Sequence, residues 1–353
     1  MRSTNWAGNQ TYGSTRLERP ASVEALQELV AREAKVRVVG SGHSFNDIAD
    51  TNGVHVSLEG MPQEVEVDRE ARSVTVNGGS RYGDVAEALQ RQGWALSNLA
   101  SLPHISVAGA VATGTHGSGD RNGSLAAAVR ALNTVEPGGE LRQVARGDAD
   151  FDGRVVALGA LGVVTSLTLD IEPSFEVAQT VYVGLPWEDF LEGFDDLTAA
   201  AYSASFFTRW VGDTVDQVWL KVRRGDGDAP ERLLGVTPSP TTLHMLPDGE
   251  VQSVTPQGGV HGPWLDRLPH FRLEFTPSSG HELQSEYLLP RDHATAAFAE
   301  LRRLGPQLAP LVQASEVRTV AADSLWLSSS YDRDVVGIHF TWLPDSRAVH
   351  AVL

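Results

Sequence analysis

A histidine placed among glycines and serines is the first feature of this sequence that could do chemistry. The segment Gly-Ser-Gly-His-Ser at residues 40–44 directly follows a valine-rich run at 36–39 that is typical of a strand. Glycine permits positive φ and lets a ligand approach the backbone closely, and successive amides in such a turn can point at an anion. The pattern favours a phosphate-type loop that carries a nucleophilic imidazole, His43. A glycine-rich hairpin with an incidental histidine is the alternative interpretation.

The dinucleotide-binding fingerprint G-x-G-x-x-G does not describe this loop. That fingerprint needs a third small residue and a helix directly after it. Phe45 occupies the position of the third glycine, and residues 46–53 are turn formers rather than a helical period. The sequence therefore predicts a phosphate-type loop of another kind.

A second unusual stretch covers residues 97–119, where nearly every side chain is small or hydroxylic. Small side chains let the backbone pack against a flat or phosphorylated ligand, and hydroxyls supply donors without charge. The stretch therefore favours a second segment that contacts the ligand. Tight packing of a helix rich in glycine and alanine beside a solvent loop is the alternative.

Polar side chains recur at every second residue in two segments near the end of the chain. Glu316 and Arg318 share one face of a predicted strand, and His339 and Thr341 share one face of another. Paired charges on a strand face usually form a solvent-exposed salt bridge. A site that binds a polar ligand is the alternative, and both interpretations stay open at this point.

Regular elements must hold these groups in place. Ser22 is a suitable N-cap for a helix with an apolar face that includes Leu26 and Val30. Apolar stripes predict further helices after Tyr82 and over residues 296–304, and Asp345 can cap a last one. Alternation and β-branched content predict strands at residues 54–58, 64–67, 73–76, 166–169, 205–210, 217–222 and 283–288.

Composition excludes several functional classes. With 353 residues, 41% of them hydrophobic, and 34 glycines, the chain is globular, turn-rich and long enough for two domains. A formal net charge of -17 at pH 7 argues against a nucleic-acid or anionic-membrane partner, since both reward clustered Lys and Arg. The absence of cysteine excludes disulfides, iron–sulfur clusters and thiol catalysis. No apolar run suits a membrane span and the first residues do not form a signal peptide, so we expect a cytoplasmic protein without a metal site.

Several motifs together resemble the bacterial alditol oxidases, which are flavoproteins of the vanillyl-alcohol-oxidase type. These motifs are the loop at residues 40–44, the small-residue segments at 101–109 and 112–117, Glu-Val-Arg-Thr at 316–319 and His-Phe-Thr-Trp at 339–342. The resemblance covers nearly the whole chain.

The resemblance implies an α+β fold with two domains. An FAD-binding domain would cover residues 1–172, and a substrate-binding domain built on a large antiparallel sheet would cover residues 173–353. Enzymes of this kind oxidise the terminal hydroxyl of alditols such as xylitol or sorbitol to the aldose and reduce O2 to H2O2. The expected cofactor is FAD, and the expected partners are a small polyol and O2, in a cytoplasmic monomer that binds neither nucleic acid nor membrane.

The same resemblance implies roles for single residues. His43 matches the histidine that bonds covalently to the 8α-methyl carbon of the flavin. The residues that match FAD contacts are Val38, Val39, Gly40, Ser41, Gly42, His43, Ser44, Ser101, Ser106, Gly109, Thr113, Gly114, Thr115, His116 and Val164.

The substrate side is expected at the two late strands. The residues that match polyol contacts or catalytic groups are Ser101, Glu316, Arg318, His339 and Thr341, with His339 as our candidate for taking the hydroxyl proton. A carboxylate that accepts several hydroxyl hydrogen bonds, beside a guanidinium that stabilises developing oxyanion charge, fits such a clamp.

The sequence departs from this family at its end. Relatives continue into a segment with a His-Trp-Gly-Lys element whose lysine is a cation of the substrate site, whereas this chain stops at Leu353 inside a predicted helix. We expect that the segment returning to the FAD domain is missing and that polyol oxidation is poor without it.

Three alternatives to an alditol oxidase stay open. A sugar-lactone (aldonolactone) oxidase or dehydrogenase of the same superfamily would share the first domain. A flavin-dependent nucleotide-sugar reductase would not need His43 and would consume NADPH. The third alternative is a truncated flavin-binding chain with little activity.

Overall fold

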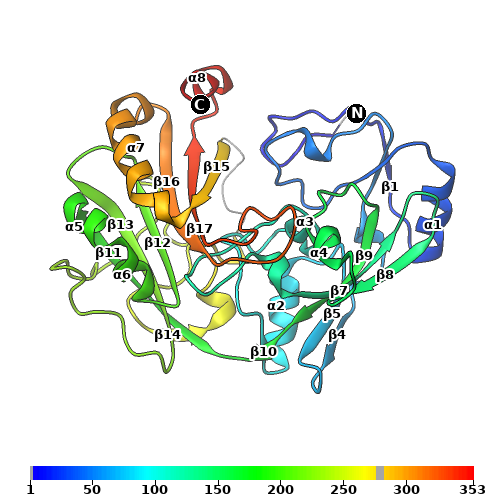
Figure 1. Ribbon diagram of the computed structural model, residues 1–353, viewed down its shortest axis with the longest axis horizontal. Coiled ribbons are helices and arrows are strands. Elements are labelled where there is room, and N and C mark those ends of the chain that lie inside the picture. Colours follow the sequence, from blue (N-terminus) through cyan, green and yellow to red (C-terminus); the bar gives the residue numbers. More distant parts are fainter. Residues whose placement is uncertain (1–2, 276–281) are drawn as a thin grey trace.

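The computed structural model describes residues 3–275 and 282–353, which fold into two halves (Figure 1). One half combines a small parallel sheet with an antiparallel sheet, and the other is built on a single large antiparallel sheet with helices on its outer side. The expected α+β class with a large antiparallel sheet is confirmed.

The first half begins with a parallel sheet that leads into the Gly-Ser-Gly-His loop. Its strand order is β1 (Arg16–Glu18), β3 (Val54–Val56) and β2 (Val36–Val38), and the loop follows the end of β2. Helix α1 (Val23–Arg32) covers this sheet with its apolar face, and Ser22 caps it by accepting a hydrogen bond from the Ala25 amide, as the sequence predicts. Two short 3-10 turns follow, η1 (Asp47–Ala49) and η2 (Leu58–Gly60).

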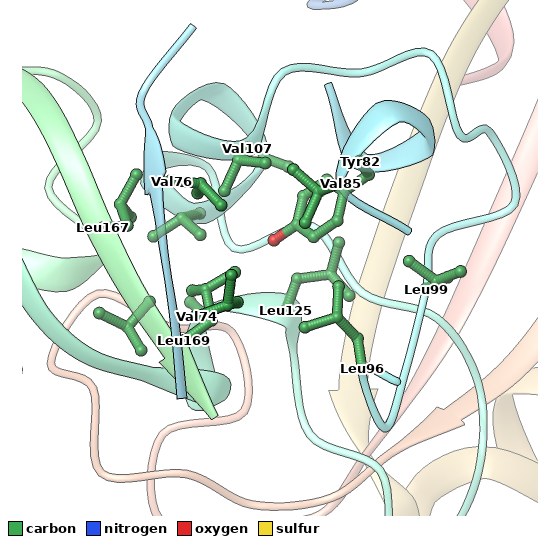
Figure 2. Packing of buried hydrophobic residues seen from close by; sticks show 14 of the residues in the cluster. Val74, Val76, Tyr82, Val85, Leu96, Leu99, Val107, Leu125, Leu167 and Leu169 are labelled. Carbon is green, nitrogen blue, oxygen red and sulfur yellow. The ribbon is translucent and has the colours of Figure 1, made fainter. Parts of the chain in front are cut away.

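An antiparallel sheet with two helices against one face forms the core of this half. Its order is β4 (Val65–Asp68), β5 (Ser73–Asn77), β9 (Val163–Asp170), β7 (Val129–Val135) and β8 (Leu141–Ala145), accompanied by α2 (Tyr82–Arg91), α3 (Val107–Ala112), η3 (Leu125–Ala128) and α4 (Phe151–Val155). Figure 2 shows side chains of β5 and β9 facing Tyr82 and Val85 of α2 and Val107 of α3. This packing fixes α3 and therefore the small-residue stretch around it.

The expected domain boundary after residue 172 falls inside a short strand. Residues Glu172–Pro173 are strand β10, which pairs with β6 (Trp94–Ala95) of the first half. The division into domains at this point stays a prediction.

The second half is organised by a seven-stranded antiparallel sheet. Its order is β14 (His261–Pro263), β11 (Glu176–Pro186), β13 (Thr214–Arg223), β12 (Ser203–Thr208), β16 (Val312–Val320), β17 (Val335–Trp342) and β15 (Leu283–Pro290). Helices α5 (Trp187–Glu192), α6 (Phe194–Ala199) and α7 (Ala294–Leu308) lie along one face of it (Figure 1). The short elements η4 (Trp264–Asp266) and η5 (Arg291–His293) and helix α8 (Ser346–Val352) complete this half, and Asp345 caps α8 as predicted.

Aromatic side chains hold the three helices on that face. Phe190 and Phe194 contact Phe206 of β12 and Phe298 of α7, with ring centroids 5.1–6.0 Å apart. Val317 of β16 packs into the same core. Because side chains alternate along a strand, its neighbours on β16 at positions 316 and 318 point to the opposite face.

Within the described residues, no helix combines the length and the apolar character that crossing a membrane requires.

Candidate active site

A cleft in the first half brings together the two segments that the sequence singled out. Its walls come from the loop after β2, from α3 with the residues around it, and from β9. The expected FAD contacts that line it are Val38, Val39, Gly40, Ser41, Gly42, His43, Ser44, Ser106, Gly109, Thr113, Thr115 and Val164. Four glycines that the sequence analysis did not assign also line it, at positions 78, 79, 159 and 162.

The walls of this cleft are built largely from backbone and small side chains, which fits a flat, phosphorylated cofactor. A Cβ added to Gly40 would overlap Ser106 Oγ, and one added to Gly78 would overlap the Val164 carbonyl. Gly42 has φ +70°, a conformation that favours glycine. A larger residue at position 40 or 78 would push the walls apart, and a larger residue at position 42 would strain the backbone. This fits FAD, with the loop after β2 and the Ser106 to Thr115 segment as the parts that would hold it.

His43 has an environment that suits a neutral nucleophile. Both of its ring nitrogens are buried, and neither makes a hydrogen bond of normal geometry within the described residues. Burial lowers the pKa of His43 to about 4, an effect that the Ser41 backbone offsets only in part. The imidazole is therefore neutral at pH 7, with an unpaired nitrogen in a cleft wall.

The N-terminal segment holds this loop, a role that sequence reasoning missed. The Trp6 ring stacks on the His43 ring with centroids 4.6 Å apart, and the Trp6 amide donates to the Gly42 carbonyl at 2.8 Å. Asn5 Nδ2 donates to the Ser44 carbonyl at 2.9 Å. Trp6 is 37 residues from His43 in sequence, so no local sequence pattern indicates that their rings stack.

A second cluster lies on the polar face of the large sheet, where Glu316 and Arg318 are buried at 6% and 7% exposure. The interpretation of this pair as a solvent-exposed salt bridge is therefore wrong. A solvent-exposed salt bridge requires that this face of β16 be open to solvent. In the structure, neighbouring strands and the loops of the first half cover that face. In the register of the sheet, Glu316 lies opposite His339, and His339 lies opposite Glu286 of β15.

Arg318 is held between two carboxylates. Its Nη2 donates to Glu286 Oε1 at 2.9 Å, and its Nε lies 3.6 Å from Glu316 Oε2. Burial alone would raise the pKa of Glu316, but Arg318 and His270 lower it well below its usual range. In the same way, His116 and Arg318 overcome the effect of burial on Glu286 and lower its pKa. Both carboxyl groups are therefore ionised, with a fixed guanidinium between them.

His339 and Thr341 lie on the same face of β17, as predicted. His339 Nε2 faces Gln284 Oε1 at 3.2 Å, and Gln284 Nε2 donates to Glu282, which orients the amide. His339 Nε2 therefore carries the proton, and Nδ1 is the nitrogen that can accept one. Burial lowers the pKa of His339, partly opposed by Glu286, so the ring is neutral at pH 7. Thr341 is half-buried and lies opposite Gln284.

The first half reaches this cluster through two of the expected residues. Arg318 Nη1 lies 3.4 Å from Ser101 Oγ, and His116 Nε2 lies 3.3 Å from Glu286 Oε1. Ser101 and His116 thus lie at the clamp formed by Glu316, Arg318 and Glu286 rather than in the wall of the cleft. The remaining expected cofactor contact, Gly114, follows α3 and has φ +66°. Sequence reasoning did not find Glu286, His270 or Lys221, all of which contact members of the cluster.

Comparisons with known proteins agree with this arrangement. The family model described as an FAD binding domain matches residues 16–145. The chain is 51% identical to an alditol oxidase from Streptomyces sp. over 99% of this chain and 84% of that protein. It is 30% identical to an L-gulono-1,4-lactone dehydrogenase from Mycobacterium tuberculosis over 95% of this chain and 82% of that protein.

Among solved structures, cholesterol oxidase from B. sterolicum superposes with a TM-score of 0.76 at 16% identity, covering 99% of this chain and 81% of that one. At this identity the likeness concerns the fold alone. The extent of the 51% match, together with the FAD binding domain, shows that the chain belongs to the alditol oxidase family of FAD-linked proteins with the vanillyl-alcohol-oxidase type of fold.

Proposed function

We propose that this chain binds FAD in the cleft of its first half and oxidises the terminal hydroxyl of alditols, such as xylitol or sorbitol, to the aldose. The main support for the proposal is that residues of the first half contact the clamp residues of the large sheet. Ser101 precedes the wall segment of the cleft and His116 follows it. Ser101 contacts the buried Arg318, and His116 contacts the partly buried Glu286 that pairs with Arg318. A polyol held by the clamp would therefore lie beside the cofactor cleft.

The clamp residues divide the work of binding and proton transfer. The ionised Glu316 and Glu286 accept hydrogen bonds from substrate hydroxyls, which are donors. Arg318, oriented by both carboxylates, stabilises negative charge that develops on the reacting oxygen. His339, neutral and with Nδ1 able to accept, takes the hydroxyl proton. When bound, FAD supplies the acceptor for the two electrons from the carbinol carbon and passes them to O2, which gives H2O2.

His43 is the residue that we assign to a covalent bond between its ring nitrogen and the 8α-methyl carbon of the flavin. Support comes from its buried, unpaired nitrogens and from its neutral state. We further propose that the enzyme is a cytoplasmic monomer that acts on a small polyol and does not bind nucleic acid. Its net charge of -17 supports the absence of a nucleic-acid partner.

The test compares xylitol, sorbitol and L-gulono-1,4-lactone as substrates of the purified FAD-loaded protein. Oxygen uptake and H2O2 release are measured for each, with product analysis by chromatography. We expect turnover of the alditols with one H2O2 per aldose. Turnover of the lactone alone would replace the proposal with a lactone oxidase, and product formation without O2 uptake would replace it with a dehydrogenase.

A further inference from the structure

Glu316 uses its two oxygens for different partners. Oε2 faces Arg318, whereas Oε1 accepts a hydrogen bond from His270 Nε2 at 2.7 Å. His270 belongs to the loop after η4, far from Glu316 in sequence, and its side chain is only 6% exposed. The ring packs against Phe207 and Trp219, with centroids 5.6 Å and 5.2 Å away. The carboxylate therefore has a rigid neighbour behind it.

A lysine lies behind that histidine. Lys221 of β13 is 1% exposed, and its Nζ contacts three acceptors: the carbonyls of Leu268 and Pro269 and the Nδ1 atom of His270. An ammonium group has three N–H donors and no acceptor, so three acceptors satisfy it completely. When Lys221 is protonated, His270 Nδ1 must therefore be a bare nitrogen, and the ring proton must lie on Nε2, where it is donated to Glu316.

The basicities of the two groups agree with this proton placement. Burial lowers the pKa of Lys221 to about 7, although Glu316 opposes the shift. Burial and the Lys221 charge lower the pKa of His270 to about 4. Lysine is the stronger base of the pair, so the shared positive charge resides on Lys221 and His270 stays neutral.

The group formed by Lys221, Arg318, Glu316 and Glu286 is balanced in charge below pH 7, where Lys221 is protonated. Lys221 and Arg318 are then the cations, and Glu316 and Glu286 are the anions. A buried charge without a partner is costly, so the loss of one member changes the state of the others. A lysine that only bound the carbonyls of residues 268 and 269 would not depend on Glu316 in this way.

We propose that Lys221 and His270 are positioning residues that act through each other on Glu316, keeping it ionised and holding Oε2 toward Arg318 and the substrate. The identity of that substrate rests on the proposed function. Neither residue touches the polyol. Because they hold the carboxylate in one orientation, it accepts hydrogen bonds from substrate hydroxyls without first losing rotational freedom, which is the advantage of a preorganised site.

The first experiment determines the proton position directly, in protein labelled with 15N-histidine. Nuclear magnetic resonance distinguishes a protonated from a bare ring nitrogen, and His270→Phe, which keeps a ring between Phe207 and Trp219, assigns the signals. At a pH between the pKa of His270, about 4, and that of Lys221, about 7, we expect a neutral His270 with its proton on Nε2. A proton on Nδ1 in the unmodified protein at this pH would overturn the proposal.

The second experiment measures coupling by thermal unfolding of Lys221→Met, Glu316→Gln and the double variant. We expect Glu316→Gln to lower Tm less in the Lys221→Met background than alone, because the cation that lost its partner is then absent. Asp150→Asn, which alters an ion-pair cluster in the first half, is the control and should be additive with Lys221→Met. Additivity between positions 221 and 316 would also overturn the proposal. If Lys221→Met does not fold, His270→Phe takes its place in the cycle.

The third experiment measures kcat/KM for xylitol against pH. The groups that face Glu316 are Arg318 on its own strand, His270 from the loop and His339 from β17, with Lys221 behind His270. We expect Lys221→Met to lower kcat/KM by about tenfold to a hundredfold and to move its acid limb to higher pH. An unchanged profile would overturn the positioning role. Absence of alditol turnover in the unmodified protein would instead refute the proposed function, and the two experiments above would still decide the positioning.

Discussion

Replacing Glu316 with glutamine tests the clamp most directly. The side chain keeps its size, and its remaining carbonyl oxygen can still accept the 2.7 Å hydrogen bond from His270. The charge is lost, however, so Arg318 retains only Glu286 as an ionised partner at 2.9 Å. Removing one member of a buried ion pair costs about 3–5 kcal/mol, and the retained hydrogen bond places this variant at about 3 kcal/mol.

That loss of stability is large enough to measure. For a half of this size, 3 kcal/mol corresponds to a decrease in Tm of roughly 6–12 °C. Loss of one preorganised group from the site should also lower kcat/KM for xylitol by about 10² or more. Thermal unfolding followed by circular dichroism gives the first quantity, and initial rates of O2 uptake give the second.

A matched variant separates this effect from a general loss of charge. Glu66 lies exposed on β4, so Glu66→Gln should change stability by no more than about 0.5 kcal/mol and leave kcat/KM unchanged. If Glu316→Gln behaves like Glu66→Gln in both assays, Glu316 has no part in a clamp and the pair with Arg318 is incidental.

Three further predictions concern the cofactor cleft and the buried lysine. Yellow colour should stay with the acid-precipitated protein and be absent from precipitated His43→Ala; colour released entirely from the unmodified protein would contradict the covalent bond. Gly40→Ala should lower the flavin content, measured by absorbance, because its Cβ overlaps Ser106 Oγ, and Ser106→Ala in the same chain should restore part of it; equal flavin content in all three proteins would contradict the tight approach. The pKa of Lys221 is about 7 when folded and 10.5 when unfolded, so the unfolded chain binds more protons between these values. The free energy of unfolding should therefore rise with pH across this window relative to Lys221→Met, and a constant difference would show that Lys221 does not titrate there.

Local sequence determined the parts of the site that depend on neighbouring residues. The valine-rich run and the glycines around His43 predicted a strand followed by a tight ligand loop, because φ preferences and strand stiffness act within a few residues. Ser22 predicted the start of α1 for the same reason. The alternation of Glu316 and Arg318 predicted a shared face, since the period of a strand is two.

Only the tertiary structure decided what those faces and loops meet. Burial of Glu316 and Arg318 depends on the register of β15, β16 and β17 and on the loops of the first half, none of which the strand sequence contains. His270 and Lys221 reach Glu316 from a loop and from β13, so no spacing in the chain links them. The alternation of β16 alone therefore determined that a charged pair would share a face, whereas long-range packing decided that this face is buried, because exposure is set by everything that covers a strand.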